Sequence, residues 1–175
     1  WTGMISLAEI ADEIQNNYDF LETNLQGIPE RHRSLRAVFE YSWQLLGSRE
    51  RELFTKLSIF RGGFSRKAAE VVTGANLLQL ETLANKSLIR VDEEKRYEVV
   101  EALRGFSSEK LMEQSELASQ MKHEHALFYL DFLSEREETL KGADQHRALD
   151  EIGIEIENIR GAWQASCGVG LREQS

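Results

Sequence analysis

Three short apolar stripes, separated by glycine-containing turns, constrain the fold of this 175-residue chain more than any other feature. They lie between Arg31 and Val72, where apolar residues recur at three- and four-residue steps, as in helices with one buried face. Gly47-Ser48 ends the first stripe and Gly62-Gly63 ends the second, so each stripe predicts a separate short helix. We expect Ser48 and Ser65 to cap the second and third helices. Three short helices joined by tight turns favour a helix-turn-helix-like domain.

The same periodicity predicts which side chains form the core. In the third helix we expect Ala68, Ala69, Val71 and Val72 to be buried. The predicted core of the whole domain consists of Leu35, Phe39, Leu53, Phe54, Leu57, Phe60, Leu80, Leu83 and Phe106.

A fourth helix and a hairpin extend this domain. The helix is expected from about Asn76 to Lys86. After it, the runs SLIRV and RYEVV flank the polar turn Asp92-Glu93-Glu94-Lys95, which is a β-hairpin pattern. The helical period returns from Glu101 to Met112. A helical bundle with one hairpin is a winged helix.

The remainder of the chain predicts antiparallel helices. One is expected from about Glu116 to Leu140, broken at Gly142, and two more from Ala143 to Ile152 and from Ile154 to Ala165. We expect Trp163, Ile159 and Phe132 to contribute to a second small core. The predicted fold class is therefore mainly α, a winged helix followed by antiparallel helices like those of tetratricopeptide (TPR) repeats. A repeat array cut short exposes an apolar end, so self-association through it is expected.

Composition predicts a cytoplasmic protein with no membrane partner. The chain is 41% hydrophobic, yet no apolar run approaches the roughly 18 residues that a membrane helix needs, and a secretory signal is lacking. Its single cysteine, Cys167, agrees with a reducing compartment. The net charge of −9 is uneven, because residues 29–72 hold nine Lys or Arg against five acids. The basic excess is read first as a solvated face and second as a nucleic-acid patch.

Candidate catalytic and metal-binding residues each have a structural explanation. His123 and His125 are two residues apart on a helix, so they point to nearly opposite sides and do not share a metal. The string from Gly62 to Lys67 offers glycines before a capped helix, but it lacks the second glycine and the hydroxyl of a phosphate-binding P-loop. We interpret it as a turn with a left-handed glycine. No catalytic residue and no metal ligand is predicted.

Five strings in order resemble a known family. They are PERHRSLRAVFEYSWQLL, LSIFRGGFSRKAAEVV, LETLANKSLIR, RYEVVEALRGFSSEKL and EIEIENIRGAW. Together they resemble the segment that follows the nucleotide-binding (NB-ARC) domain in bacterial signal-transduction ATPases with numerous domains (STAND). The resemblance implies that residues 1–28 end the helical lid of an ATPase, that 29–113 form a winged helix, and that 114–175 begin a helical-repeat sensor. It also implies that the chain, which begins at Trp1 without an initiator methionine, is part of a longer protein.

The resemblance implies further functional positions. In much of the wider family a Met-His-Asp motif follows the wing, and its histidine contacts the β-phosphate of the nucleotide. The matching residues here are Val99, Val100 and Glu101, and Val100 has no side-chain donor, so phosphate sensing from it is not expected. No cofactor is expected in this segment itself, which is no enzyme, whereas ATP or ADP with Mg is implied for the parent protein.

Two hypotheses of different classes remain open. The first is a non-catalytic relay segment that couples an upstream ATPase domain to downstream helical repeats through protein contacts. In it, the basic residues Arg31, Arg33 and Arg36 face an acidic partner domain or a nucleotide phosphate. The second is a DNA-binding winged-helix transcription factor with a helical oligomerisation tail. We do not expect specific DNA binding, because the fourth helix offers only Lys86 and the hairpin turn is acidic.

Overall fold

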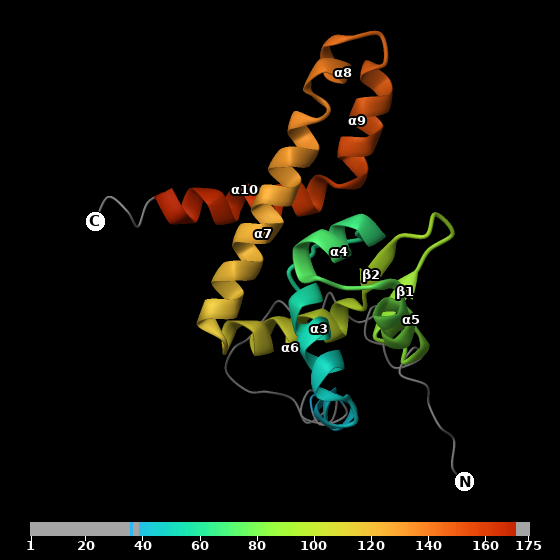
Figure 1. Ribbon diagram of the computed structural model, residues 1–175, viewed down its shortest axis with the longest axis vertical. Coiled ribbons are helices and arrows are strands. Elements are labelled where there is room, and N and C mark those ends of the chain that lie inside the picture. Colours follow the sequence, from blue (N-terminus) through green and yellow to red (C-terminus); the bar gives the residue numbers. More distant parts are fainter. Residues whose placement is uncertain (1–35, 37–38, 171–175) are drawn as a thin grey trace, which may run out of the picture.

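The structure, a computed structural model, describes residue 36 and residues 39–170 (Figure 1). Residues 39–44 are helical. They are followed by α3 (Ser48–Leu57), α4 (Arg66–Thr73), α5 (Leu77–Asn85), β1 (Ile89–Val91), β2 (Tyr97–Val99), α6 (Glu101–Met112), α7 (Ser115–Ser134), α8 (Glu137–Lys141), α9 (Gln145–Ile154) and α10 (Ile156–Gly170). This order confirms the predicted fold class, mainly α with one small antiparallel hairpin in the described part. Leu35 and residues 1–28, which the resemblance assigns to the end of an ATPase lid, lie outside the described residues.

Helices α3, α4 and α5 and the hairpin form the winged helix. β1 pairs antiparallel with β2, which confirms the predicted hairpin, and the structure sets the register with Ile89 opposite Val99. Phe64, between α3 and α4, forms a single antiparallel bridge to β2: its N–H donates to the Tyr97 carbonyl at 2.7 Å and its carbonyl accepts the Tyr97 N–H at 2.9 Å. The turn that we call the wing, residues 92–96, is closed by the Asp92 carboxylate, which accepts the Arg96 N–H at 2.8 Å. The two hydrogen bonds between Phe64 and Tyr97 fix the segment before α4 to the hairpin.

One of the two predicted helix caps is correct. The Ser65 hydroxyl accepts the Ala68 N–H at 3.1 Å at the start of α4, as expected. Ser48, however, is the first helical residue of α3, and the N-cap position is Gly47. There the Glu50 carboxylate accepts the Gly47 N–H at 2.7 Å and provides the stabilisation expected from Ser48.

The predicted core is confirmed at most positions. Phe54, Leu57, Phe60, Leu80 and Leu83 are at most 1% exposed, Leu53 and Phe106 are also buried, and Phe39 is half-buried. Val71 is an exception at 55% exposed, because the buried stripe of α4 runs through Ala68, Ala69 and Val72.

The helical tail, α7 to α10, packs on the winged helix and does not build a core of its own around Trp163. α10 crosses α7 near the middle of α7, while α8 and α9 form a hairpin beyond its end (Figure 1). Ala126, Tyr129 and Ala162 belong to the same buried cluster as Phe54. Ile159 and Phe132 pack against that main cluster and Trp163 is 68% exposed, so the prediction that these three residues form a second core was wrong.

The long helix predicted to reach Leu140 is interrupted. α7 ends at Ser134, and α8 begins at Glu137. At this interruption the Arg136 guanidinium donates to the Phe132 carbonyl at 2.7 Å and lies 3.5 Å from the centre of the Phe132 ring. A cation bound to a last-turn carbonyl favours a helix end at this point.

Candidate functional site: the junction of wing and tail

The three positions that resemble the nucleotide-sensing motif lie at the entry to α6. Val99 and Val100 are 3% and 5% exposed and belong to the main core, so both side chains are closed to solvent. The Glu101 carboxylate accepts two hydrogen bonds from the Arg104 guanidinium. An acid in the first turn also suits the positive end of α6. The described geometry thus gives these residues structural roles.

Glu101 and Arg104 also border a small surface cavity. It has a volume of about 260 Å³ and is lined by Arg61, Gly62, Glu101, Arg104 and Glu157. Because two carboxylates accompany the two arginines, the lining has no excess of positive charge.

Of the three basic residues predicted to face a partner, only Arg36 lies in the described part of the chain. It is exposed, and its guanidinium binds the Glu109 carboxylate at 2.9 Å. Both side chains are more than half exposed, so this pair contributes at most about 1 kcal/mol. Arg31 and Arg33 lie outside the described residues.

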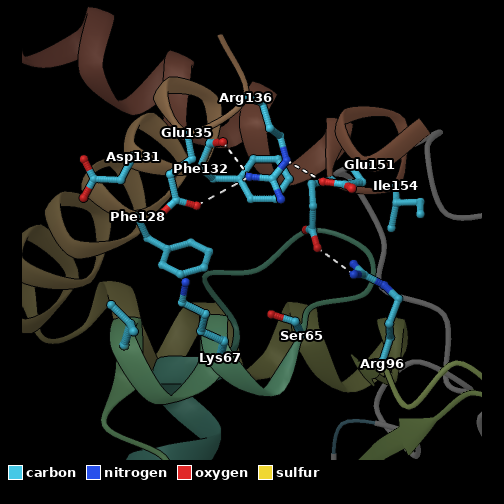
Figure 2. Close-up of a pocket in the computed structure, with 12 residues that line it drawn as sticks. Ser65, Lys67, Arg96, Phe128, Asp131, Phe132, Glu135, Arg136, Glu151 and Ile154 are labelled. Atoms are coloured by element: carbon cyan, nitrogen blue, oxygen red, sulfur yellow. Dashed lines mark hydrogen bonds and ion pairs between the residues drawn. The ribbon is translucent and has the colours of Figure 1, made fainter. Parts of the chain in front are cut away.

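A more elaborate polar cluster joins the wing to the tail. We define the junction as Arg96, Tyr129, Glu155, Asn158 and the Gly62-Gly63 turn. Arg96 extends from the wing and donates to the Glu155 carboxylate at 2.6 Å and to the Gly63 carbonyl at 2.8 Å (Figure 2 shows the ion pair). Gly62 has a φ of 74°, the left-handed conformation that the sequence predicted for this turn.

Glu155 is the acceptor at the centre of the junction. It lies between α9 and α10, is 6% exposed, and binds Arg96 through one carboxylate oxygen. Its other oxygen accepts the Tyr129 hydroxyl at 2.9 Å and the Asn158 amide at 3.0 Å. A buried carboxylate is tolerated when a countercharge and hydrogen bonds replace its water, and all are present here.

Asn158 ties the first turn of α10 to the glycine turn. Its amide donates to the Gly63 carbonyl at 2.9 Å, and its side-chain oxygen accepts the Arg61 N–H at 2.8 Å. The side chain is 1% exposed. These contacts connect backbone positions that are more than 90 residues apart, so they fix the tail against the winged helix.

Two buried titratable side chains of α7, His125 and Tyr129, lie close to Glu155. His125 is 2% exposed and its Nε2 has no hydrogen-bond partner. Burial lowers the pKa of His125 to about 4; the Arg61 charge acts the same way, while Asn158 and Glu155 oppose the shift. Burial and the adjacent Glu155 carboxylate raise the pKa of Tyr129 above its usual range, so its hydroxyl remains a donor. Glu155 therefore accepts from a protonated tyrosine and has a neutral histidine nearby.

Sequence reasoning found the glycine turn, but it missed the four polar residues of the junction. Arg96 and Glu155 are 59 residues apart, and neither belongs to a motif of fixed spacing. The available signal was local: Glu155 and Asn158 interrupt an isoleucine-rich stripe three residues apart, as a buried polar pair on one helix face would.

The described part of the chain offers neither a metal cluster nor a membrane-spanning helix. No group of three His, Cys, Asp or Glu side chains within that part of the chain is placed to hold a metal ion. Among its helices, none has the length and apolar character needed to cross a membrane.

Comparison with known proteins gives a distant relationship to transcriptional regulators. The chain is 30% identical over 169 residues to proteins of Mycobacterium bovis and Mycobacterium tuberculosis that carry the name "Putative HTH-type transcriptional regulator". The alignment covers 91% of this chain but 19% of each relative, so the chain spans about a fifth of their length. No protein-family profile and no solved structure matches the chain.

Proposed function

We propose that this chain is a non-catalytic segment of a transcriptional regulator, in which the winged helix and the tail act as one body and pass a conformational signal through protein contacts. The name of the mycobacterial relatives supports transcriptional regulation, the class of the second hypothesis from sequence. The observation that carries the relay role is the buried junction. Because this cluster fixes the tail to the wing, a conformational change in the tail is expected to change the position of the wing as well.

The surface of the winged helix supports protein contacts more than DNA contacts. On α5, the helix that would enter a DNA groove, Leu77 and Leu78 are 43% and 72% exposed. Lys86, which follows α5, is bound to both Glu50 carboxylate oxygens at 2.7 Å. DNA binding requires cations that approach phosphates, whereas exposed leucines on a helix suit an apolar protein partner.

The wing has an equally unfavourable charge for DNA. Asp92, Glu93 and Glu94 are all exposed on it. Arg96, which could offset them, is turned inward to Glu155. Three acids at the tip would repel a phosphate backbone.

Transcript profiling tests the proposal. We would replace Arg96 by Gln in the whole protein, in its native host, with Arg160→Gln as the matched control because Arg160 forms an exposed pair with Glu157. Arg96→Gln should change the transcripts that deletion of the gene changes, at unaltered protein level, whereas Arg160→Gln should not. If deletion of the gene leaves the transcript profile unchanged, the regulatory role is wrong.

A DNA-binding winged helix with an oligomerisation tail is the second candidate, and the HTH-type name of the relatives favours it. A fluorescence anisotropy titration of this chain against random duplex at low salt separates the two. The relay proposal expects no submicromolar binding. Submicromolar affinity that falls steeply with added salt, and is lost when Arg31, Arg33 and Arg36 become alanine, would favour the DNA-binding candidate.

The parent protein is proposed to include an ATPase domain that binds ATP or ADP with Mg²⁺, with helical repeats beyond the tail. Support for this context comes from the resemblance of the five sequence strings alone. Nucleotide hydrolysis by the whole protein, compared with this chain alone, tests it: the whole protein should hydrolyse ATP and the chain should not.

A further inference from the structure

A groove of about 450 Å³ lies between α4, α7 and the α9–α10 turn, next to the junction (Figure 2). This volume is within the range of small-molecule sites in proteins. Its walls come from both parts of the fold, since α4 belongs to the winged helix while α7 and α9 belong to the tail. An occupant would therefore touch both.

The floor of the groove is apolar. Phe128 and Phe132 of α7 are half-buried there, one turn apart. Val71 of α4 and Ile154 of α9 are each 55% exposed, on opposite sides. Large apolar side chains left open to water on facing walls would gain hydrophobic free energy from an apolar ligand.

Most charged side chains that line the groove form ion pairs with one another, and on the inner side of the groove one charged side chain does not. Arg96 is bound to Glu155, and Arg136 is bound to Glu151 at 2.8 Å. Glu135 lies 3.7 Å from Arg136.

Lys67 is the exception, because its ammonium has no hydrogen bond or ion pair with any described residue, and it points into the groove toward Phe128 (Figure 2). Asp131 is also without such a partner, but it lies at the outer edge with its carboxylate directed away from Lys67 (Figure 2). The inner surface thus offers an apolar floor with one available cation.

We propose that this groove binds an organic monoanion with an apolar body, such as a medium-chain fatty acid or an aromatic carboxylate. The carboxylate pairs with Lys67, and the apolar body lies on Phe128 between Val71 and Ile154. A polyanion such as a nucleotide does not fit, because Arg96 and Arg136 are already paired with Glu155 and Glu151, which leaves Lys67 as the one available cation among the described residues of the groove. The regulatory role of the site rests on the proposed function. A ligand that bridges α4, α7 and α9 stabilises the packing of the tail on the winged helix, as an effector of the relay would.

Calorimetric titration of the 175-residue chain with 2-naphthoate and with octanoate tests the proposal. Neutral 2-naphthamide has the same apolar body as 2-naphthoate and isolates the role of the charge. We expect saturable one-site binding of both carboxylates and at least roughly tenfold weaker binding of the amide, since a charge-assisted contact with Lys67 is lost. Failure of both carboxylates to bind at millimolar concentration would overturn the proposal, as would equal binding of the amide or tighter binding of ADP.

Variants locate the site. Lys67→Gln should weaken 2-naphthoate binding by about tenfold or more, while Arg66→Gln, an exposed cation on the same helix that does not line the groove, should leave it unchanged. Val71→Glu, at an exposed position, should abolish binding by placing a like charge beside the carboxylate. Equal weakening by Lys67→Gln and Arg66→Gln would show non-specific attraction and contradict the site. These outcomes do not depend on transcript levels, so failure of this proposal and failure of the proposed function remain distinguishable.

Discussion

Glu155 is the residue on which the junction depends most, because three side chains donate to its carboxylate. Replacing it by Gln keeps the shape but removes the countercharge of Arg96, whose side chain is 17% exposed. Breaking a buried ion pair by changing one partner leaves an uncompensated charge, so we expect Glu155→Gln to lower the free energy of unfolding by about 3 kcal/mol. Urea denaturation followed by circular dichroism measures the loss.

Glu157→Gln is the matched control, two residues along the same turn. Its carboxylate pairs with Arg160 at 2.6 Å, but both side chains are more than half exposed. We expect a change below about 1 kcal/mol, because water replaces an exposed partner readily. Equal effects of the two substitutions would mean that the Arg96–Glu155 pair has no special role in stability.

His125 should make stability depend on pH. Its pKa is lowered to about 4 in the folded protein, against an ordinary value of 6.5, so the unfolded chain takes up the proton first. The contribution is therefore complete above pH 6.5 and is lost as pH falls toward 4, by about 3 kcal/mol in total. Urea denaturation at several pH values should show a reduced slope across this window for His125→Gln.

His146→Gln provides the comparison for this measurement. His146 is exposed on α9, so its replacement should leave the free energy of unfolding at pH 7 nearly unchanged. A wild-type chain whose stability is flat between pH 6.5 and 4 would contradict the burial of a neutral His125.

The turn before α4 requires a glycine at position 62, whereas α6 does not require the glycine at position 105. Gly62 has a positive φ of 74°, and an added Cβ would meet nothing within 4 Å, so Gly62→Ala should cost the backbone strain alone, about 1 kcal/mol. Gly105 lies inside α6 with equally open surroundings, and Gly105→Ala should stabilise by about 0.5–1 kcal/mol. Thermal unfolding of both variants should give melting temperatures that move in opposite directions.

Local features of the sequence predicted most elements, and contacts distant in sequence explain the errors. The α4 cap at Ser65, the wing and the glycine turn each depend on neighbouring residues, and all three were predicted. The end of α7 depends on how Arg136 folds back on Phe132, which helical periodicity does not describe. The Arg96–Glu155 pair depends on the packing of the tail, so no pattern in the sequence connects Arg96 with Glu155, 59 residues away.

At the scale of the whole molecule, the tail completes the core of the winged helix. Ala126 and Tyr129 of α7 and Ala162 of α10 lie in one buried cluster with Phe54 of α3. A winged helix that shares its core with the following helices cannot move independently of them without exposing these side chains. This favours a relay that responds as one body over two domains joined by a hinge.

Hydrogen exchange of Phe54→Ala tests whether the molecule unfolds as one body. Phe54 is 1% exposed in α3, and its truncation should cost about 3–5 kcal/mol. If α10 is stabilised by the same core, its slowest amides should lose protection by the same free energy as those of α3, although no residue of α10 has been changed. Leu149→Ala, at a position 49% exposed on α9, should leave the protection of both helices nearly unchanged. Loss of protection in α3 with α10 unaffected would show that tail and winged helix unfold separately, and the junction would then be a contact between independent units.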